Sequence, residues 1–390
     1  MVEKYDDLKD LKLLSIEELD LENKRILIRV DFNVPIKNGI VKDTTRIDAT
    51  LKTIKYAQNR GKVILMSHLD RPSGYDPKFS LKPVYEILKT KLDNVSMAPD
   101  CVGKEVEEML NNMRNGEILL LENLRFHNGE EKNDDEFTKA LANLGDVYIN
   151  EAFAAAHREH ASVVGVPAYL KKQGKEVGIG YLMHTELETW NPVLKLTGNK
   201  ILLVGGGKLK EKIKAVEKLS KKFNKVIVGG VVANVFLKAA GYNIGCSLVT
   251  EKGIDYTEKA KEILNKIDNI VLPKRVVVAN GESRIVNINE IQLQDRIVDI
   301  LIEQELLDEI SKASVIVWFG PFGIYEQGYS KGTTTLKEAI NHSEGYAVIG
   351  GGDIIAATPG IKAKLSTGGG ASIYLLTNGT LPALEVLKTS

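Results

Sequence analysis

Hydrophobic runs typical of buried β-strands alternate with helical patterns through the first half of the chain. Apolar, β-branched runs occupy residues 26–32, 63–67, 118–123 and 147–150. Between them, apolar residues recur at helical spacing near 46–59, 81–92, 104–113 and 134–144. Alternation of strand and helix predicts an α/β fold, with parallel sheets covered by helices on both faces.

The second half repeats this alternation with a different strand ending. Four apolar runs end in glycines, at residues 201–207, 226–230, 347–352 and 365–370, and a helical pattern follows each run. Glycine lets the backbone turn sharply and approach a ligand closely, and the next helix offers free N–H groups. One glycine triplet alone is more often a tight turn. Four of them predict a polyanion site, most simply a nucleotide site.

The length of 390 residues predicts two domains, because one hydrophobic core seldom serves so long a chain. The stretch 178–194 has a helical pattern with no glycine between Tyr181 and Thr197, which predicts a rigid interdomain helix. We therefore expect an N-terminal domain over 1–177 and a C-terminal domain over 195–370. Ligands in such folds gather at the carboxyl ends of the strands.

Charge and composition exclude several classes of protein. The 52 basic and 52 acidic residues give no net charge, so we expect neither nucleic-acid nor membrane binding. No run of 18 apolar residues occurs, and the charged start is unlike a secretion signal, so we expect a cytoplasmic protein. Cys101 and Cys246 fit no metal or redox spacing and are interpreted as reduced structural thiols.

Cations and a few polar residues follow the predicted strands of the first half. Because these strand ends meet at one edge of a parallel sheet, the side chains can share one pocket, and arginine suits carboxylate and phosphate oxygens. An isolated arginine is more often a solvated charge or part of an ion pair. The set comprises Arg29, Asp31, Arg46, His68, Arg71, Arg125, His157 and Arg158.

Several polar residues lie beside the glycines of the second half, each with two interpretations. Lys208 and Lys212 are four apart at a helix start, facing either a ligand or solvent. Asp353 is either a helix cap or a ligand of Mg²⁺, and Glu326 contacts either ribose or solvent. The P-loop and dinucleotide fingerprints are both missing from the sequence.

These residues resemble the phosphoglycerate kinase family over nearly the whole chain. The motifs that carry the resemblance are RVDFNVP at 29–35, SHL at 67–69, LENLRF at 121–126, AHR at 156–158, GGGD at 350–353 and STGGGA at 366–371. The resemblance implies two similar-sized α/β domains, each a mostly parallel, doubly wound sheet, in a bilobal protein with a hinge. It also implies that the segment 371–390 packs back on the N-terminal domain.

The resemblance further implies a ligand for each domain. The first domain would bind 3-phosphoglycerate or 1,3-bisphosphoglycerate, and the second would bind Mg²⁺ with ADP or ATP. Transfer would be direct and in line after the lobes close, and we expect a monomer. The implied glycerate-binding residues are Asp31, Asn33, Arg46, His68, Arg71, Arg125 and Arg158.

By the same resemblance the nucleotide side and the catalytic groups can be named. Arg46, Lys208, Gly369 and Gly370 would act on the transferring phosphoryl group, and Asp353 would contact the metal. The implied nucleotide-binding residues are Gly206, Lys212, Gly230, Glu326, Gly350, Gly351, Gly352 and Asp353.

Two alternatives to an active kinase stay open at this point. Phe319 and Ile354 stand where the family usually has asparagine and threonine, and Arg275 stands two residues after Pro273, where the family often has an aspartate. The departures at Phe319 and Ile354 motivate the hypothesis of a catalytically weakened, nucleotide-binding paralogue. The other alternative is a dinucleotide-dependent oxidoreductase, against which the missing fingerprint counts.

Overall fold

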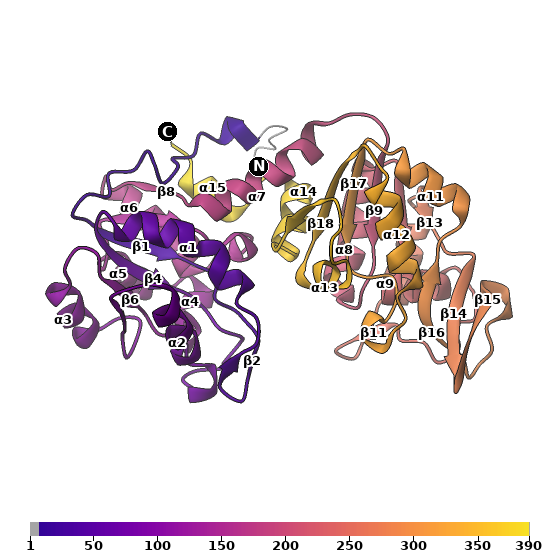
Figure 1. Ribbon diagram of the computed structural model, residues 1–390, viewed down its shortest axis with the longest axis horizontal. Helices are drawn as coiled ribbons and strands as arrows, with labels where there is room; N and C mark the ends of the chain where they lie inside the picture. Colours follow the sequence, from indigo (N-terminus) through magenta and orange to yellow (C-terminus); the bar gives the residue numbers. More distant parts are fainter. Residues whose placement is uncertain (1–7, 390) are drawn as a thin grey trace. The chain divides into compact units, whose positions relative to one another are not determined.

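The chain folds into two compact units, each with its own parallel sheet. The structure, a computed structural model, describes residues 8–389. Unit 1 consists of residues 1–188 and 378–390, and unit 2 consists of residues 189–377. Figure 1 shows the elements of both units, coloured along the sequence.

Unit 1 is built on a six-stranded sheet in the order β5-β6-β4-β1-β7-β8, and every neighbouring pair is parallel. The order changes direction between β1 and its neighbours β4 and β7, as in a doubly wound sheet. The strands are β1 (Arg25–Arg29), β4 (Lys62–Met66), β5 (Val95–Met97), β6 (Ile118–Leu120), β7 (Val147–Asn150) and β8 (Val177–Ile179); a hairpin adds β2 (Ile36–Lys37) and β3 (Ile40–Val41).

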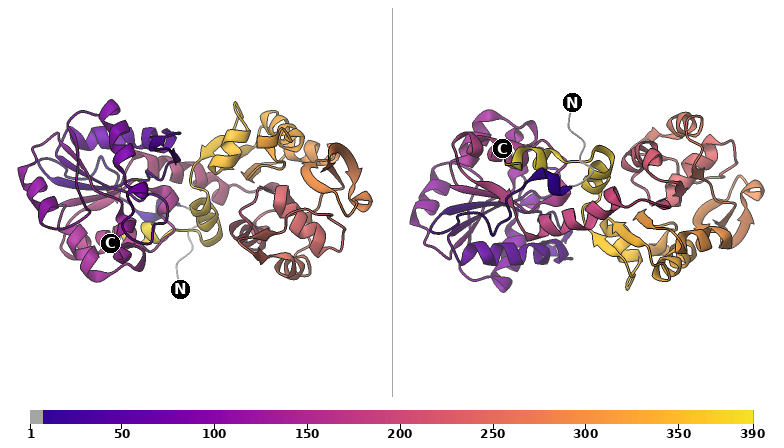
Figure 2. Two further views of the ribbon diagram at one scale, coloured as in Figure 1. Left: turned by 90° about the horizontal axis from the view of Figure 1, so that it is seen from below. Right: turned by 90° about the horizontal axis from the view of Figure 1, so that it is seen from above.

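Helices flank this sheet, as Figures 1 and 2 show. They are α1 (Thr45–Gln58), α2 (Lys82–Lys91), α3 (Lys104–Asn112), α4 (Asn128–Lys132), α5 (Asp135–Ala142), α6 (Val166–Lys172), α7 (Tyr181–Lys195) and α15 (Pro382–Leu387). Short helical turns are η1 (Leu8–Leu11), η2 (Pro77–Phe79), η3 (Leu124–Phe126), η4 (Phe153–Ala155) and the wider turn η5 (Ala161–Gly165).

The core of unit 1 explains why these strands carry continuous apolar runs. Ile26 and Ile28 of β1 pack in one fully buried cluster with Val63 and Leu65 of β4. From α1, Ile47 and Ile54 enter the same cluster at helical spacing. A central strand covered on both faces has no solvent side, so it has no polar alternation.

The end of the chain returns to unit 1. The backbone N–H of Ala383 donates to Ala156 O at 3.1 Å, and Thr389 N donates to Lys12 O at 3.0 Å. The Nζ of Lys171 donates to Val386 O at 3.1 Å. These bonds join α15 and the last residues to α6 and to the residues that directly follow η1 and η4.

The boundaries of these parts differ from those expected from the sequence. The expected interdomain helix at 178–194 is α7, which begins at Tyr181 because residues 177–179 form β8. The unit boundary falls within α7, between Glu188 and Thr189. The C-terminal segment expected from residue 371 is also divided, because α14 (Gly370–Asn378) belongs to unit 2 except for its last residue.

Unit 2 contains a second six-stranded parallel sheet, in the order β13-β10-β9-β17-β18-β19. Its strands are β9 (Lys200–Val204), β10 (Lys225–Val228), β13 (Ile270–Val271), β17 (Val315–Phe319), β18 (Tyr346–Gly350) and β19 (Lys364–Ser366). The helices, besides α14, are α8 (Leu209–Leu219), α9 (Gly230–Ala239), α10 (Thr257–Leu264), α11 (Gln304–Ser311), α12 (Lys331–Asn341) and α13 (Gly352–Ala357), with the turns η6 (Ser220–Lys222), η7 (Ile288–Glu290) and η8 (Tyr325–Gln327).

The four glycine-ended runs are β9, β10, β18 and β19, and α8, α9, α13 and α14 follow them. The sequence did not suggest the antiparallel sheet β15-β14-β16, formed by β14 (Arg275–Asn280), β15 (Glu282–Asn287) and β16 (Arg296–Leu301). A small hairpin of β11 (Thr250–Glu251) and β12 (Ile254–Asp255) completes the unit. Among the described residues, no helix has the length and apolar character needed to cross a bilayer.

Candidate active site in two parts

A buried arginine organises the carboxyl edge of the sheet in unit 1. Arg29, the last residue of β1, is fully buried, and its Nε donates to Ser162 Oγ at 2.7 Å. Its NH2 lies 3.1 Å from His68 Nδ1, and its NH1 donates to the carbonyl of Val30. A buried guanidinium held by neutral partners leaves a positive charge at this edge.

The charges around His68 show which cations gather there. Burial, followed by the charges of Arg29, Arg125, Arg158 and Arg46, lowers the pKa of His68 well below its ordinary value. These arginines come from segments far apart in the sequence, and all act on one imidazole. His68 is therefore neutral in the ligand-free protein, and added negative charge would offset the surrounding arginines.

Asp31 supplies a carboxylate beside this positive cluster. Its Oδ2 accepts from Arg46 NH1 at 2.7 Å, and its Oδ1 accepts from the backbone N–H of Asn33 at 3.1 Å. The side chain of Asn33 in turn accepts from Asp70 N at 2.9 Å. Asp31 is almost completely buried, whereas Arg46 keeps about a third of its side chain exposed. Arg46 is thus oriented by Asp31 and still accessible to a ligand.

Arg125 and Arg71 complete the set on the η3 side. Arg125 Nε lies 3.1 Å from Glu131 Oε1, and its NH1 donates to the carbonyl of Asp70. Burial lowers the pKa of Arg125, and the charges of Arg158, Arg29 and Arg71 lower it further, against the opposing effect of Glu131. Every residue expected to hold the glycerate substrate therefore lies in, or is electrostatically coupled to, this edge of unit 1.

The sequence interpretation missed a supporting layer beneath these arginines. Glu130 is fully buried and accepts from Ser162 N at 2.9 Å and from Ser162 Oγ at 2.6 Å. His160 Nδ1 lies 3.8 Å from Glu130 Oε1. Ser162 therefore links Arg29 to a buried carboxylate. The only signal in the sequence was that His160 and Ser162 closely follow the motif at 156–158.

In unit 2, a pocket lies at the carboxyl ends of β9 and β17. It combines bare glycine backbone, apolar side chains and two carboxylates on the rim, as expected for a nucleoside with its phosphates. Its lining includes Gly206, Gly230, Val231, Asn234, Leu248, Phe322, Glu326 and Asp353.

The glycines expected to bind the nucleotide and the phosphoryl group are of two kinds, and only Gly206 and Gly230 among those described next line this pocket. Gly206 and Gly230 have φ of +79° and +53°, and a Cβ on Gly230 would lie 2.6 Å from Gly206 N. These two turns pack directly on each other and exclude side chains. Gly351 and Gly369 also have positive φ, but a Cβ there would meet nothing within 4 Å. Their backbone is open to an incoming group.

Gly350, Gly352 and Gly370 complete the expected glycine set and, like Gly351 and Gly369, lie outside this pocket lining. A Cβ on Gly350 would overlap the Phe319 ring at 2.2 Å, so this glycine packs against the core. A Cβ on Gly352 would meet nothing within 4 Å, and one on Gly370 would lie 3.5 Å from the Glu211 carboxylate of α8. Gly370 therefore lies close to the start of α8, where Lys208 and Lys212 are found.

The two lysines at the start of α8, Lys208 at its N-cap and Lys212 in its first turn, differ sharply in environment. Lys208 Nζ lies 3.1 Å from Asp353 Oδ2, and both side chains are about two-thirds exposed. Lys212 is almost fully buried, and its Nζ lies 4.9 Å from the centre of the Phe319 ring. Burial lowers the pKa of Lys212 to about 7. Phe319 and Ile354 are both fully buried, so the two apolar departures from the family pattern belong to the core.

One further pocket residue was not expected from the sequence. Asn234 of α9 is 3% exposed, and its Nδ2 donates to Leu248 O at 3.2 Å. Its Oδ1 has no hydrogen-bond partner within the part of the chain that the structure describes. Since Nδ2 is fixed by Leu248, an unsatisfied acceptor is present in the pocket lining.

The donors on the pocket rim fit a magnesium ion bound through phosphate. Mg²⁺ keeps several waters and takes one or two carboxylates together with substrate phosphates. Asp353 and Glu326 both line the pocket, and Asp353 is exposed enough to exchange Lys208 for a metal.

Comparisons with known proteins place the chain in a family. A sequence model described as "Phosphoglycerate kinase" matches residues 16–379. A phosphoglycerate kinase of Pseudothermotoga lettingae is 42% identical, covering 96% of this chain and 98% of that protein. One of Dictyoglomus turgidum is 41% identical, over 96% of this chain and 98% of the relative.

Solved structures agree with these relatives. The structure of phosphoglycerate kinase from Coxiella burnetii matches with a TM-score of 0.79 and 34% identity, over 96% of this chain and 98% of that one. The enzyme from Pyrococcus horikoshii matches with a TM-score of 0.81 and 29% identity, over the same shares.

The fold and the comparisons define an α/β enzyme of the kinase class. The chain belongs to the phosphoglycerate kinase family. The expected fold class, with two parallel sheets flanked by helices, is confirmed. The oxidoreductase alternative is wrong, and no finding favours the weakened paralogue.

Proposed function

We propose that this protein catalyses the reversible transfer of a phosphoryl group from 1,3-bisphosphoglycerate to ADP, giving 3-phosphoglycerate and ATP. The observation that carries the proposal is the set of arginines around the neutral His68. A substrate with a carboxyl and a phosphate group supplies the negative charge that this edge of unit 1 lacks. Arginine binds both groups through paired hydrogen bonds.

The nucleotide belongs in the pocket of unit 2. Val231, Leu248 and Phe322 offer apolar surface to a base, and Glu326 can accept from ribose hydroxyls. The open backbone at Gly351 and Gly369 leaves room for phosphate oxygens. Mg²⁺, held by Asp353 together with phosphate oxygens, supplies charge neutralisation when it is bound.

Phosphoryl transfer of this kind depends on positioning and charge neutralisation rather than on a covalent intermediate. Asp31 orients Arg46, so that the guanidinium can face the group in transit. When Asp353 binds Mg²⁺, its ion pair with Lys208 is broken. The ammonium group of Lys208 can then contact the phosphoryl group as it moves. Direct in-line transfer requires the two bound substrates to meet, because the two sets of residues lie in different units.

The test is an assay of the purified protein with 3-phosphoglycerate, ATP and Mg²⁺, in which formation of 1,3-bisphosphoglycerate is coupled to NADH oxidation. We expect turnover that depends on all three components. Absence of turnover together with measurable ADP binding would indicate a weakened paralogue instead. Small molecules suffice for this reaction, and we propose a monomer without nucleic-acid or membrane partners.

A further inference from the structure

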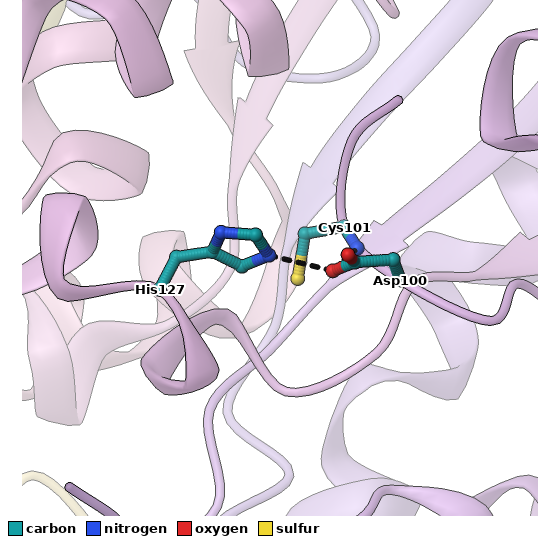
Figure 3. Close-up of side chains that lie close together, drawn as sticks. All are labelled: Asp100, Cys101 and His127. Atoms are coloured by element: carbon teal, nitrogen blue, oxygen red, sulfur yellow. Dashed lines mark hydrogen bonds and ion pairs between the residues drawn. The ribbon is translucent and has the colours of Figure 1, made fainter. Parts of the chain in front are cut away.

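Three side chains of unit 1 that carry possible metal ligands lie close together (Figure 3). Asp100 and Cys101 lie in the loop between β5 and α3, and His127 follows η3. One possible ligand atom from each residue lies within 4.8 Å of the other two. Among the residues that the structure describes, this is the one group of three such side chains with that geometry.

We propose that Asp100, Cys101 and His127 form a binding site for a borderline-soft divalent transition metal, of which Zn²⁺ is the type. Zinc takes sulfur, imidazole nitrogen and carboxylate oxygen in tetrahedral geometry, often with water in the fourth position. A thiolate and a carboxylate would also balance the two positive charges of the ion. Mg²⁺ prefers an all-oxygen shell and does not fit this donor set.

The fold brings these residues together although they are distant in sequence. Strands β5 and β6 pair in parallel, so the loops that follow them leave the sheet at the same edge. The thiol of Cys101 donates to Glu122 O at 3.0 Å, just beyond β6, and Cys101 N donates to Asp100 Oδ1 at 2.6 Å. This pairing explains why no short metal-binding motif is visible in the sequence.

His127 is also held in place. Its ring stacks on Phe137, with 4.8 Å between the ring centres and 19° between the planes. Its Nε2 lies 2.6 Å from Asp100 Oδ1, so the nitrogen that would bind a metal already faces the other two residues. Ligands fixed by packing lose little conformational freedom when they bind an ion.

Binding would exchange existing contacts for metal bonds. The Cys101 thiol would release its proton to solvent and form a sulfur–metal bond, giving up its hydrogen bond to Glu122 O. The contact between Asp100 and His127 would open, because two ligands of one zinc ion lie about 3.5 Å apart. The side chains of Asp100 and His127 are 50% and 30% exposed, which gives an ion access to the buried sulfur.

The local charge favours a cation over a free thiolate. Cys101 is fully buried, and a possible ligand oxygen of Asp100 lies within 4.8 Å of its sulfur. A buried thiolate beside a carboxylate is unfavourable by itself, whereas a divalent ion is attracted by both groups. The proposal does not depend on the reaction proposed for the two-part site.

The experiment is a titration of the full-length, metal-free protein with Co²⁺, which replaces Zn²⁺ and reports on thiolate ligands by a near-ultraviolet charge-transfer band. We expect one equivalent to produce the band and Zn²⁺ to abolish it. A large excess of Mg²⁺ should leave it unchanged. A missing band in the wild-type protein would overturn the proposal.

Three variants identify the ligands. Cys101→Ser should lose the band, while Cys246→Ser serves as the matched control because Cys246 is the other free cysteine in the described chain. His127→Gln keeps the thiol and lies at a partly exposed position, so it should fold and bind Co²⁺ at least about tenfold more weakly. A band that persists in Cys101→Ser, or an unchanged affinity in His127→Gln, would show that these residues do not bind the metal.

Discussion

The Nζ of Lys212 lies 4.9 Å from the centre of the Phe319 ring, at an almost fully buried position. Phe319 itself stacks on Trp190, with ring centres 5.8 Å apart, so the ring is fixed. A ring face attracts an ammonium group but does not replace its lost hydration. This explains why the pKa of Lys212 falls to about 7 when no phosphate is nearby.

Nucleotide binding should therefore take up a proton at alkaline pH. Phosphate oxygens beside Lys212 stabilise its charged form, whereas the free protein loses this charge above about pH 7. We expect ADP affinity to fall as pH rises above 7, by at most about tenfold per unit. Calorimetry at pH 8.5, in buffers of different ionisation enthalpy, measures the proton uptake directly.

The matched control for this measurement is Lys212→Met, which fills the same space without a charge. It should bind ADP more weakly and show no proton uptake between pH 7 and 9. Equal uptake in the variant and the wild type would assign the proton to another group.

Arg46→Ala should lower turnover by about 10²–10⁴-fold without loss of the fold, because the side chain acts on transition-state charge. Arg46→Lys should recover only part of the activity, since lysine lacks the planar fork that pairs with Asp31. Arg114→Ala is the control, because Arg114 is exposed and precedes β6, at the other edge of the sheet. Steady-state kinetics that fail to separate Arg46→Ala from Arg114→Ala would make Arg46 an ordinary surface residue.

Asp353→Asn should raise the Mg²⁺ concentration needed for half-maximal activity, because the amide oxygen is a weaker magnesium ligand than a carboxylate. Lys208→Ala should instead lower mainly kcat, since its contact strengthens as the phosphoryl group moves. Magnesium titrations of activity distinguish the two effects. The control is Asp255→Asn, which disrupts another exposed pair, with Lys238, also 3.1 Å apart, in the same unit. Identical titrations for Asp353→Asn and Asp255→Asn would leave Asp353 as a helix-terminal residue only.

Sequence patterns predicted the two parallel sheets well because their central strands are buried on both faces. Ile26, Ile28 and Val63 are fully buried. Continuous apolar runs of this kind can be recognised in the sequence without knowing which strands pair with each other. The antiparallel sheet was missed for the opposite reason. Five of the six residues of β15, an outer strand of that sheet, are exposed, so the apolar pattern that marks a strand is weak there.

The residues of the candidate site divide in the same way, into those that a local motif marks and those whose environment depends on distant parts of the chain. Arg46, Lys208 and Asp353 could be named from motifs, since their own neighbours in sequence mark them. The burial of Arg29 could not be predicted, because its partner Ser162 belongs to η5, far along the chain. The altered pKa of Lys212 also depends on packing against Phe319, which no local pattern reveals.

The histidines of unit 1 should make stability depend on pH below neutrality. Burial, followed mainly by the charges of Arg125 and Arg29, lowers the pKa of His160 to about 3, and burial with Arg158 lowers that of His157 to about 4. Above pH 6.5 both imidazoles are neutral in the folded and the unfolded chain, so this stability is fully present. As pH falls toward the folded values, the unfolded chain binds protons first, and stability is lost.

The expected slope is about 1.4 kcal/mol per pH unit for each histidine within that window. Urea unfolding of the full chain between pH 7 and 4.5 measures it, and His160→Asn should reduce the slope. The exposed His342, replaced by Asn, is the control and should leave the slope unchanged. Inorganic phosphate should also reduce the slope by adding negative charge beside the arginines. A slope unaffected by His160→Asn would mean that His160 is protonated in the folded protein.

Asn234 should give the nucleotide site a preference for adenine. Its Oδ1 is an acceptor without a partner in the described structure, and Leu248 O holds Nδ2 so that the amide cannot turn around. The 6-amino group of adenine is a donor that can satisfy this oxygen, whereas hypoxanthine has a carbonyl at that position. Leaving a buried acceptor unmatched costs about 1–3 kcal/mol, so ADP should bind about 5- to 150-fold more tightly than IDP. Asn234→Leu keeps the volume and removes the acceptor, and it should weaken ADP binding while leaving IDP binding nearly unchanged. Calorimetry with both nucleotides on both proteins decides the matter: equal affinities of the wild type for ADP and IDP would show that Asn234 does not contact the base.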